Sequence, residues 1–198
     1  MIYLDAGATT LQKPPAVALA VQSAMRRMAT PGRGGHPPAM RAADAVYDCR
    51  CLAGALFDAQ PEQVVFTMNA THALNLAIKT LVKPGGRAVI SGFEHNAVLR
   101  PLHHLGAEII VAGRRLFAPA DTISAFDRAI TPGTSAVICT HVSNVFGYIL
   151  PVEEIAALCR ARGVPFVLDA SQSAGLLPVS LEALGAAFVC MPGHKALY

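Results

Sequence analysis

Short apolar runs alternate with amphipathic stretches along most of this chain, and the alternation predicts an α/β fold. The runs are rich in β-branched residues and centre on Val64, Val89, Ile109, Val137, Val167 and Val189. Because each run is apolar throughout, both faces of each predicted strand are expected to be buried, as in a parallel sheet between helices. Strands alternating with helices predict a three-layer, doubly wound, mostly parallel sheet.

Helical periodicity occupies the intervals between the runs. In the segment L-P-V-E-E-I-A-A-L-C-R-A-R, Ile155 and Leu158 share one face, and the charged residues can stay in water. Before the first run, helices are expected over residues 15–28 and from about residue 40, separated by the glycine-rich T-P-G-R-G-G-H. The predicted organisation is an N-terminal arm, residues 1–14, and one large domain, residues 15–198.

Composition excludes several classes of protein. Hydrophobic residues make up 53% and charged residues 15%, which indicates a folded globular chain. The net charge of +3 is scattered, so nucleic acid is not an expected partner. No stretch of about eighteen apolar residues is free of charges and prolines, and the N-terminus lacks the pattern of a signal peptide. The five cysteines include no Cys-x-x-Cys, which favours reduced thiols in a cytoplasmic protein over disulfides or a metal site.

Candidate chemistry follows the strand-like runs. Asp169, His95, Thr71 and Lys195 each come soon after a run, and the carboxyl ends of parallel strands share one edge of a sheet. An acid, a glutamine, a histidine and a lysine gathered there suit pyridoxal 5'-phosphate (PLP), with the lysine as its Schiff-base partner. The alternative without chemistry is that Asp169 only forms a turn and that Lys195 is a solvated surface residue.

The residue types fit the parts of this cofactor. Asp169 can keep the pyridine nitrogen protonated, which lets the ring accept electrons, and Gln172 can reach the phenolic oxygen. Lys195 follows an apolar run, and partial burial favours the neutral amine that attacks an aldehyde. His95 can stack on the ring or simply begin a helix. A loop amide is the alternative for Gln172.

Further candidates surround these residues. The amides and hydroxyl at Ala70, Thr71 and His72 begin a helix and suit a phosphate, although a plain cap is equally consistent. His194 can also donate to the phosphate. Asn144 is either a turn residue or a contact to substrate and ring. Arg33 and His36, in the glycine-rich loop, can bind a substrate carboxylate.

Together these segments resemble the class V, fold-type I PLP-dependent aminotransferases, especially the cysteine desulfurase and selenocysteine lyase branch. The matching motifs are Y-L-D-A-G-A-T-T, P-G-R-G-G-H, N-A-T-H-A-L-N-L-A, E-H-N-A-V-L-R-P, T-H-V-S-N-V-F-G, V-L-D-A-S-Q-S-A-G and G-H-K, and they span the chain. The resemblance implies that Lys195 forms the Schiff base and carries protons, that Asp169 pairs with the pyridinium and that His95 stacks on the ring. It implies further that Gln172 contacts the phenolic oxygen, and that Thr71 and His194 hold the phosphate.

The sequence departs from the family pattern at three places. Pro192 stands where the family usually has a serine or threonine that binds the phosphate, His72 replaces a common glutamate, and Asp5-Ala6-Gly7 replaces Asp-Asn-Ala. Family members are about twice as long, so the chain is expected to contain the large domain without its last strand and without the small C-terminal domain. The absent strand is expected between the runs at Val64 and Val189.

The function implied is that of a PLP-dependent desulfurase, which takes sulfur or selenium from cysteine or selenocysteine and leaves alanine. In the family the missing half carries the reactive cysteine and an arginine for the substrate carboxylate, so the isolated chain is expected to be inactive and unstable alone. A homodimer and a sulfur-acceptor protein are implied as partners of the full enzyme. Another class V aminotransferase or PLP lyase, or a non-catalytic scaffold, remain alternatives.

Overall fold

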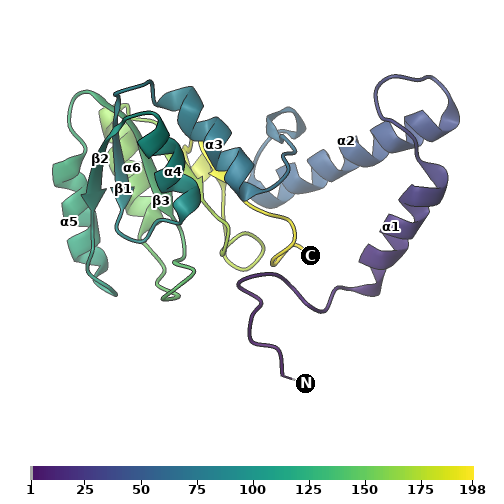
Figure 1. Ribbon diagram of the computed structural model, residues 1–198, viewed down its shortest axis with the longest axis horizontal. Coiled ribbons are helices and arrows are strands. Elements are labelled where there is room, and N and C mark those ends of the chain that lie inside the picture. The colour runs from purple at the N-terminus through teal and green to yellow at the C-terminus, as the bar shows by residue number, and fades with distance from the viewer. Residues whose placement is uncertain (1) are drawn as a thin grey trace.

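Five strands form one parallel sheet in the computed structural model, which describes residues 2–198 (Figure 1). The strand order is β2-β1-β3-β4-β5, and every neighbouring pair is parallel. The strands are β1 (Arg87–Ser91), β2 (Glu108–Ala112), β3 (Thr134–Thr140), β4 (Phe166–Asp169) and β5 (Phe188–Cys190). The predicted doubly wound, mostly parallel α/β sheet is confirmed.

Helices cover both faces of this sheet and bury two apolar clusters against it. One cluster joins α3 and α4 to the sheet through residues such as Leu74 and Val98, and the other joins α5 and α6 through Phe126 and Ile155. The α-helices are α1 (Pro15–Arg27), α2 (Pro37–Phe57), α3 (Ala70–Leu81), α4 (Asn96–His104), α5 (Pro119–Ala129), α6 (Val152–Arg162) and α7 (Leu181–Leu184), and a short 3-10 helix, η1, spans Pro61–Gln63. No helix within residues 2–198 is both long and apolar enough to cross a membrane.

The strand predicted around Val64 is wrong. Residues 64–67 have no regular structure, and Val65 and Phe66 are 70% and 52% exposed. A strand needs a neighbour to take its backbone hydrogen bonds, and β5 is an edge strand that pairs only with β4 among the described residues. Apolar composition alone therefore does not produce a strand here, because the described chain supplies no partner for it.

The first two helices project away from the sheet. Figure 1 shows α2 running outward from the body of the molecule, with α1 folded back beside it. No residue of α1 is buried, and the buried residues of α2 lie near its two ends. The side chains of the sheet's two apolar clusters come from residue 57 onward, so folding of the core does not involve α1.

The register of the sheet places polar groups at its carboxyl edge. Thr140, the last residue of β3, is level with Asp169 of β4, and Asp169 is level with Cys190 of β5. The strand order reverses beside β1, whose neighbours β2 and β3 both follow it in the chain. Loops leave such a point in opposite directions, and ligands of doubly wound sheets bind at that edge.

Candidate functional site at the carboxyl edge of the sheet

Asp169 is the buried acid of this edge. Only 3% of it is exposed, and its Oδ1 accepts hydrogen bonds from the backbone N–H of Ser171, at 3.0 Å, and from the Ser171 hydroxyl. Burial raises the pKa of Asp169, while the Ser171 hydrogen bonds and the nearby His95 and Lys195 side chains lower it in part. The Asp169 carboxyl group is therefore within electrostatic reach of both side chains.

Lys195 lies in the loop after β5 and is half-buried. Burial lowers the pKa of its amine, and the nearby Asp169 carboxylate opposes this shift. A lowered pKa increases the fraction of neutral amine at neutral pH, and the neutral form is the nucleophile. The structure thus brings together a carboxylate, an imidazole and an activated amine.

His95 is the N-cap residue of α4. Its Nδ1 accepts the backbone N–H of Ala97 at 3.1 Å, and the residue is exposed. The cap fixes one ring nitrogen and hence the direction of the imidazole. The capping role and a stacking role are compatible, because the cap uses the edge of the ring and stacking uses its face.

Glu94 is a buried acid that the sequence analysis missed. The residue as a whole is only half-buried, but its Oε2 is out of contact with solvent and has no hydrogen-bond partner among the described residues. Its Oε1 accepts the hydroxyl of Ser91 and the backbone N–H of Thr140. Burial raises the pKa of Glu94 to about 8, these hydrogen bonds lower it, and the Asp169 charge adds to the rise. The available signal was an acid in the turn after β1, next to His95.

Gln172 and His194 contact the N-terminal arm. The Gln172 Nε2 donates to the backbone oxygen of Gly7 at 3.1 Å, and the His194 Nδ1 lies 3.1 Å from the Thr9 hydroxyl. Both side chains belong to segments that leave the carboxyl edge, after β4 and β5 respectively. The arm therefore lies against the same edge as Asp169.

One backbone N–H in the first turn of α3 is already bonded to the capping residue Asn69. The Asn69 Oδ1 accepts the backbone N–H of His72 at 2.9 Å, so this amide is already used. Ala70 and Thr71, at the first two positions of the helix, carry the amides that a helix of this length leaves without an intrahelical acceptor. Thr71 is exposed. The turn offers these two amides and the Thr71 hydroxyl to an anion.

The remaining predicted residues lie in two different loops. Asn144 is exposed in the turn after β3, in which the Gly147 N–H donates to the Ser143 oxygen. Arg33 and His36 lie between α1 and α2, at the end of α2 that is remote from the sheet (Figure 1). A helix of 21 residues is roughly 30 Å long, so the structure does not bring these two residues to the edge. The His36 Nδ1 instead accepts the Ala39 N–H at 3.4 Å as the cap of α2.

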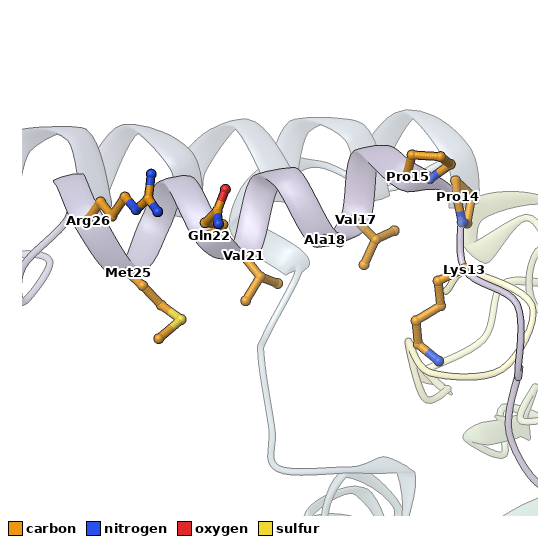
Figure 2. A pocket seen from close by; sticks show the side chains of 9 residues that line it. All are labelled: Lys13, Pro14, Pro15, Val17, Ala18, Val21, Gln22, Met25 and Arg26. Carbon is orange, nitrogen blue, oxygen red and sulfur yellow. The ribbon is translucent and has the colours of Figure 1, made fainter.

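A hollow along α1 is not part of this arrangement. Figure 2 shows side chains from the start and one side of α1 around an open, largely apolar surface. The lining residues are Lys13, Pro14, Pro15, Val17, Ala18, Val21, Gln22, Met25 and Arg26. Its charged groups are two cations without an acid or nucleophile beside them, so it offers no catalytic constellation.

Several cysteine desulfurases are similar to this chain in sequence or in fold. A probable cysteine desulfurase from Aeropyrum pernix is 32% identical over all of this chain and half of its own length. The cysteine desulfurase IscS from Pectobacterium carotovorum is 33% identical over 98% of this chain and half of its own. The chain therefore spans about half the length of the curated relatives it matches.

Two solved structures agree with the fold described above. The apo structure of a cysteine desulfurase from Thermococcus onnurineus NA1 has a TM-score of 0.86 and 30% identity, covering 98% of this chain and 50% of its own. The structure of SspA in complex with cysteine has a TM-score of 0.87 and 26% identity, over 98% of this chain and 58% of its own. The family model for aminotransferase class-V matches residues 2–198. The chain therefore belongs to the class-V aminotransferase family.

Proposed function

We propose that this protein is a PLP-dependent enzyme of the cysteine desulfurase type, which acts on a small amino acid. The observation that carries the proposal is the meeting of Asp169, His95 and Lys195 at the carboxyl edge of the sheet. Membership of the class-V family and relatives named cysteine desulfurase support it. We further propose that residues 1–14 act as an arm and residues 15–198 as the cofactor domain.

The residues at the edge fit PLP in charge and geometry. Asp169 is a buried acceptor whose Oδ1 is already occupied by Ser171, which leaves Oδ2 for a pyridinium N–H. Ala70 and Thr71 would hold the phosphate with His194. Pro192, which is buried, adds no hydroxyl, so fewer donors serve the phosphate than in the family pattern. When bound, PLP supplies a ring that accepts the electron pair released at the substrate α-carbon.

Each of these residues would then have its own task. The Lys195 amine would hold the cofactor covalently through its aldehyde group and would carry protons. The Asp169 carboxyl group would keep the pyridine nitrogen protonated, and Gln172 would donate to the phenolic oxygen. His95 would orient the ring by stacking. Asn144 would contact substrate and ring. Arg33 and His36 would bind a substrate carboxylate only at a site other than the carboxyl edge of their own chain.

The sulfur acceptor is proposed to lie outside the buried thiols of this chain. Cys139, Cys159 and Cys190 are buried, and burial raises the pKa of Cys159 and Cys190 to about 12 each. A thiol with so high a pKa is protonated at neutral pH and is a poor nucleophile. We therefore propose that sulfur passes to a thiolate outside this core, within a homodimer or on an acceptor protein.

The test is covalent attachment of PLP to Lys195. The protein is mixed with PLP, reduced with borohydride and mapped by peptide mass spectrometry, with Lys195→Ala as the essential variant and Lys79→Ala, an exposed lysine on α3, as its matched control. Label on Lys195 that is lost only in the first variant is the expected result.

Asp169→Asn should weaken PLP retention. Absence of label, or label spread over surface lysines, would overturn the proposal and favour a non-catalytic scaffold, for which Pro192 is the supporting observation. Alanine or a keto acid as product would separate a desulfurase from an aminotransferase.

A further inference from the structure

The N-terminal arm holds the backbone of the lysine loop, which we define as residues 192–198. The backbone N–H of Thr10 and the hydroxyl of Thr9 both donate to the His194 oxygen, each at 3.1 Å. The Thr10 hydroxyl donates to the backbone oxygen of Lys195 itself. Two consecutive threonines thus donate three hydrogen bonds to the backbone of His194 and Lys195.

Hydrogen bonds within the arm hold its own backbone in one conformation, so the arm can fix the position of the loop that it contacts. The Tyr3 hydroxyl donates to the Thr9 oxygen at 2.8 Å and to the Asp5 oxygen at 3.0 Å, and the Ala8 N–H donates to the Asp5 oxygen at 3.0 Å. These bonds close a small loop of the arm. The Gly7 oxygen of that loop accepts the Gln172 side chain, which anchors it to the segment after β4.

The lysine loop has little regular structure to hold it otherwise. It follows the three-residue edge strand β5, and its residues belong to no helix or strand. Within the described part of the chain, the other backbone hydrogen bond of the loop is the weak one from the Tyr198 N–H to the Lys195 oxygen, at 3.3 Å. The direction of the Lys195 side chain thus depends on contacts made from outside the loop.

We propose that Thr9 and Thr10 are positioning residues for Lys195, and that the arm acts as a clasp which aims the amine at the carboxyl edge beside Asp169. The proposal rests on the proposed function for its chemical consequence, but the clasp itself can be tested without cofactor. Its sequence basis is the segment Y-L-D-A-G-A-T-T. Tyr3 closes the arm on itself and Gly7 anchors it to Gln172, while Thr9 and Thr10 bind the lysine loop.

The first experiment measures the clasp alone. Amide hydrogen exchange of the peptide covering residues 192–198 is compared between the wild-type protein, Thr10→Val and Thr10→Ser. Thr80→Val is the matched control, because the Thr80 hydroxyl donates only within α3, to the Leu76 oxygen. Faster exchange in Thr10→Val, with near wild-type exchange in Thr10→Ser and Thr80→Val, is expected. Unchanged exchange in Thr10→Val would overturn the clasp.

The second experiment measures its consequence for Lys195. The equilibrium constant for PLP attachment is expected to fall about two- to tenfold in Thr10→Val, the change that loss of one hydrogen bond produces, and to recover in Thr10→Ser. The pH midpoint of attachment should also rise, because a released amine is more solvated and holds its proton more tightly. Equal constants and midpoints in all variants would overturn the positioning role. Failure of the wild type to attach PLP at Lys195 would instead reject the proposed function, with the clasp still judged by hydrogen exchange.

Discussion

The Glu94 side chain accepts the backbone N–H of Thr140 at 2.8 Å, and this bond ties the turn after β1 to the end of β3. The same oxygen accepts the Ser91 hydroxyl at the end of β1. The strands β1 and β3 are thus joined at the edge where His95 and Asp169 lie. The cost is a carboxyl group whose other oxygen is buried without a hydrogen-bond partner in residues 2–198.

Glu94→Gln should make the protein less sensitive to pH. Burial raises the pKa of Glu94 from 4.5 to about 8, so the folded state holds a proton that the unfolded state releases. The free energy of unfolding of the wild type should therefore fall relative to the variant as pH rises from about 5 to 8, and the difference should become independent of pH below about pH 4. From pH 4 to pH 7 the wild type should lose on the order of 3 kcal/mol relative to the variant.

Urea unfolding at a series of pH values measures this difference. Glutamine keeps an oxygen for the Ser91 and Thr140 donors, so the hydrogen bonds to both strands remain. Glu108→Gln is a suitable control, because that acid is exposed at the surface and pairs with Arg87. A stability difference between Glu94→Gln and wild type that is the same at pH 4 and pH 8 would show that folding does not raise the pKa of Glu94.

Two leucines on α3 should differ sharply in their contribution to stability. Leu74 is 1% exposed in the cluster between α3, α4 and the sheet, and Leu76 is 49% exposed. Leu74→Ala should lower the free energy of unfolding by about 2–5 kcal/mol, and Leu76→Ala by about 0.5 kcal/mol or less. Both changes alter helix propensity equally, so the difference reports burial. Equal losses in denaturant unfolding would mean that α3 packs on the sheet through another face.

The exposed and the buried cysteines should differ in reactivity. Cys49 on α2 is exposed and Cys51 is half-buried, whereas Cys139, Cys159 and Cys190 are buried in the sheet and α6. With a chromogenic disulfide reagent, Cys49 should react quickly in the native protein and the three buried thiols only on unfolding. Cys49→Ser should remove the fast phase. Simultaneous reaction of all thiols under native conditions would contradict the packing described here.

The unpaired edge beside β5 should promote self-association. Among the described residues β5 has a free edge, and residues 64–67 expose apolar side chains; exposed strand edges and apolar patches both pair with other chains. Sedimentation velocity should show association that grows with protein concentration, and Val65→Lys should reduce it. Val21→Lys, an exposed site on α1, is the control. A cooperative melt of a strictly monomeric chain at high concentration would argue that this edge is protected.

Much of the fold was predictable because strand signals in a doubly wound sheet are local. Five of the six apolar runs are strands, and Ile155 is buried where helical periodicity placed it. The run at Val64 has the same composition but lacks a neighbour, and pairing is a property of the whole sheet. No local pattern distinguishes these two situations.

The candidate site was predictable only where a residue lies at or soon after the end of a strand. Asp169 is the last residue of β4 and His95 lies four residues after β1, and the parallel topology brings both to one edge. Arg33 and His36 depend on the direction taken by α2, which no short motif encodes. Glu94, Thr9 and Thr10 were missed because their roles arise from hydrogen bonds to segments distant in sequence, up to 185 residues away.

The alignment of β3 with β4 has one more consequence. Successive side chains of a strand point to opposite faces, so a displacement of β4 by a single residue would turn the Asp169 carboxylate toward the apolar layer under α5 and α6. The core would then enclose a carboxyl group away from the carboxyl edge, where the proposed function needs it to face the cofactor. Accurate strand alignment during folding is therefore a condition for the proposed chemistry as well as for stability.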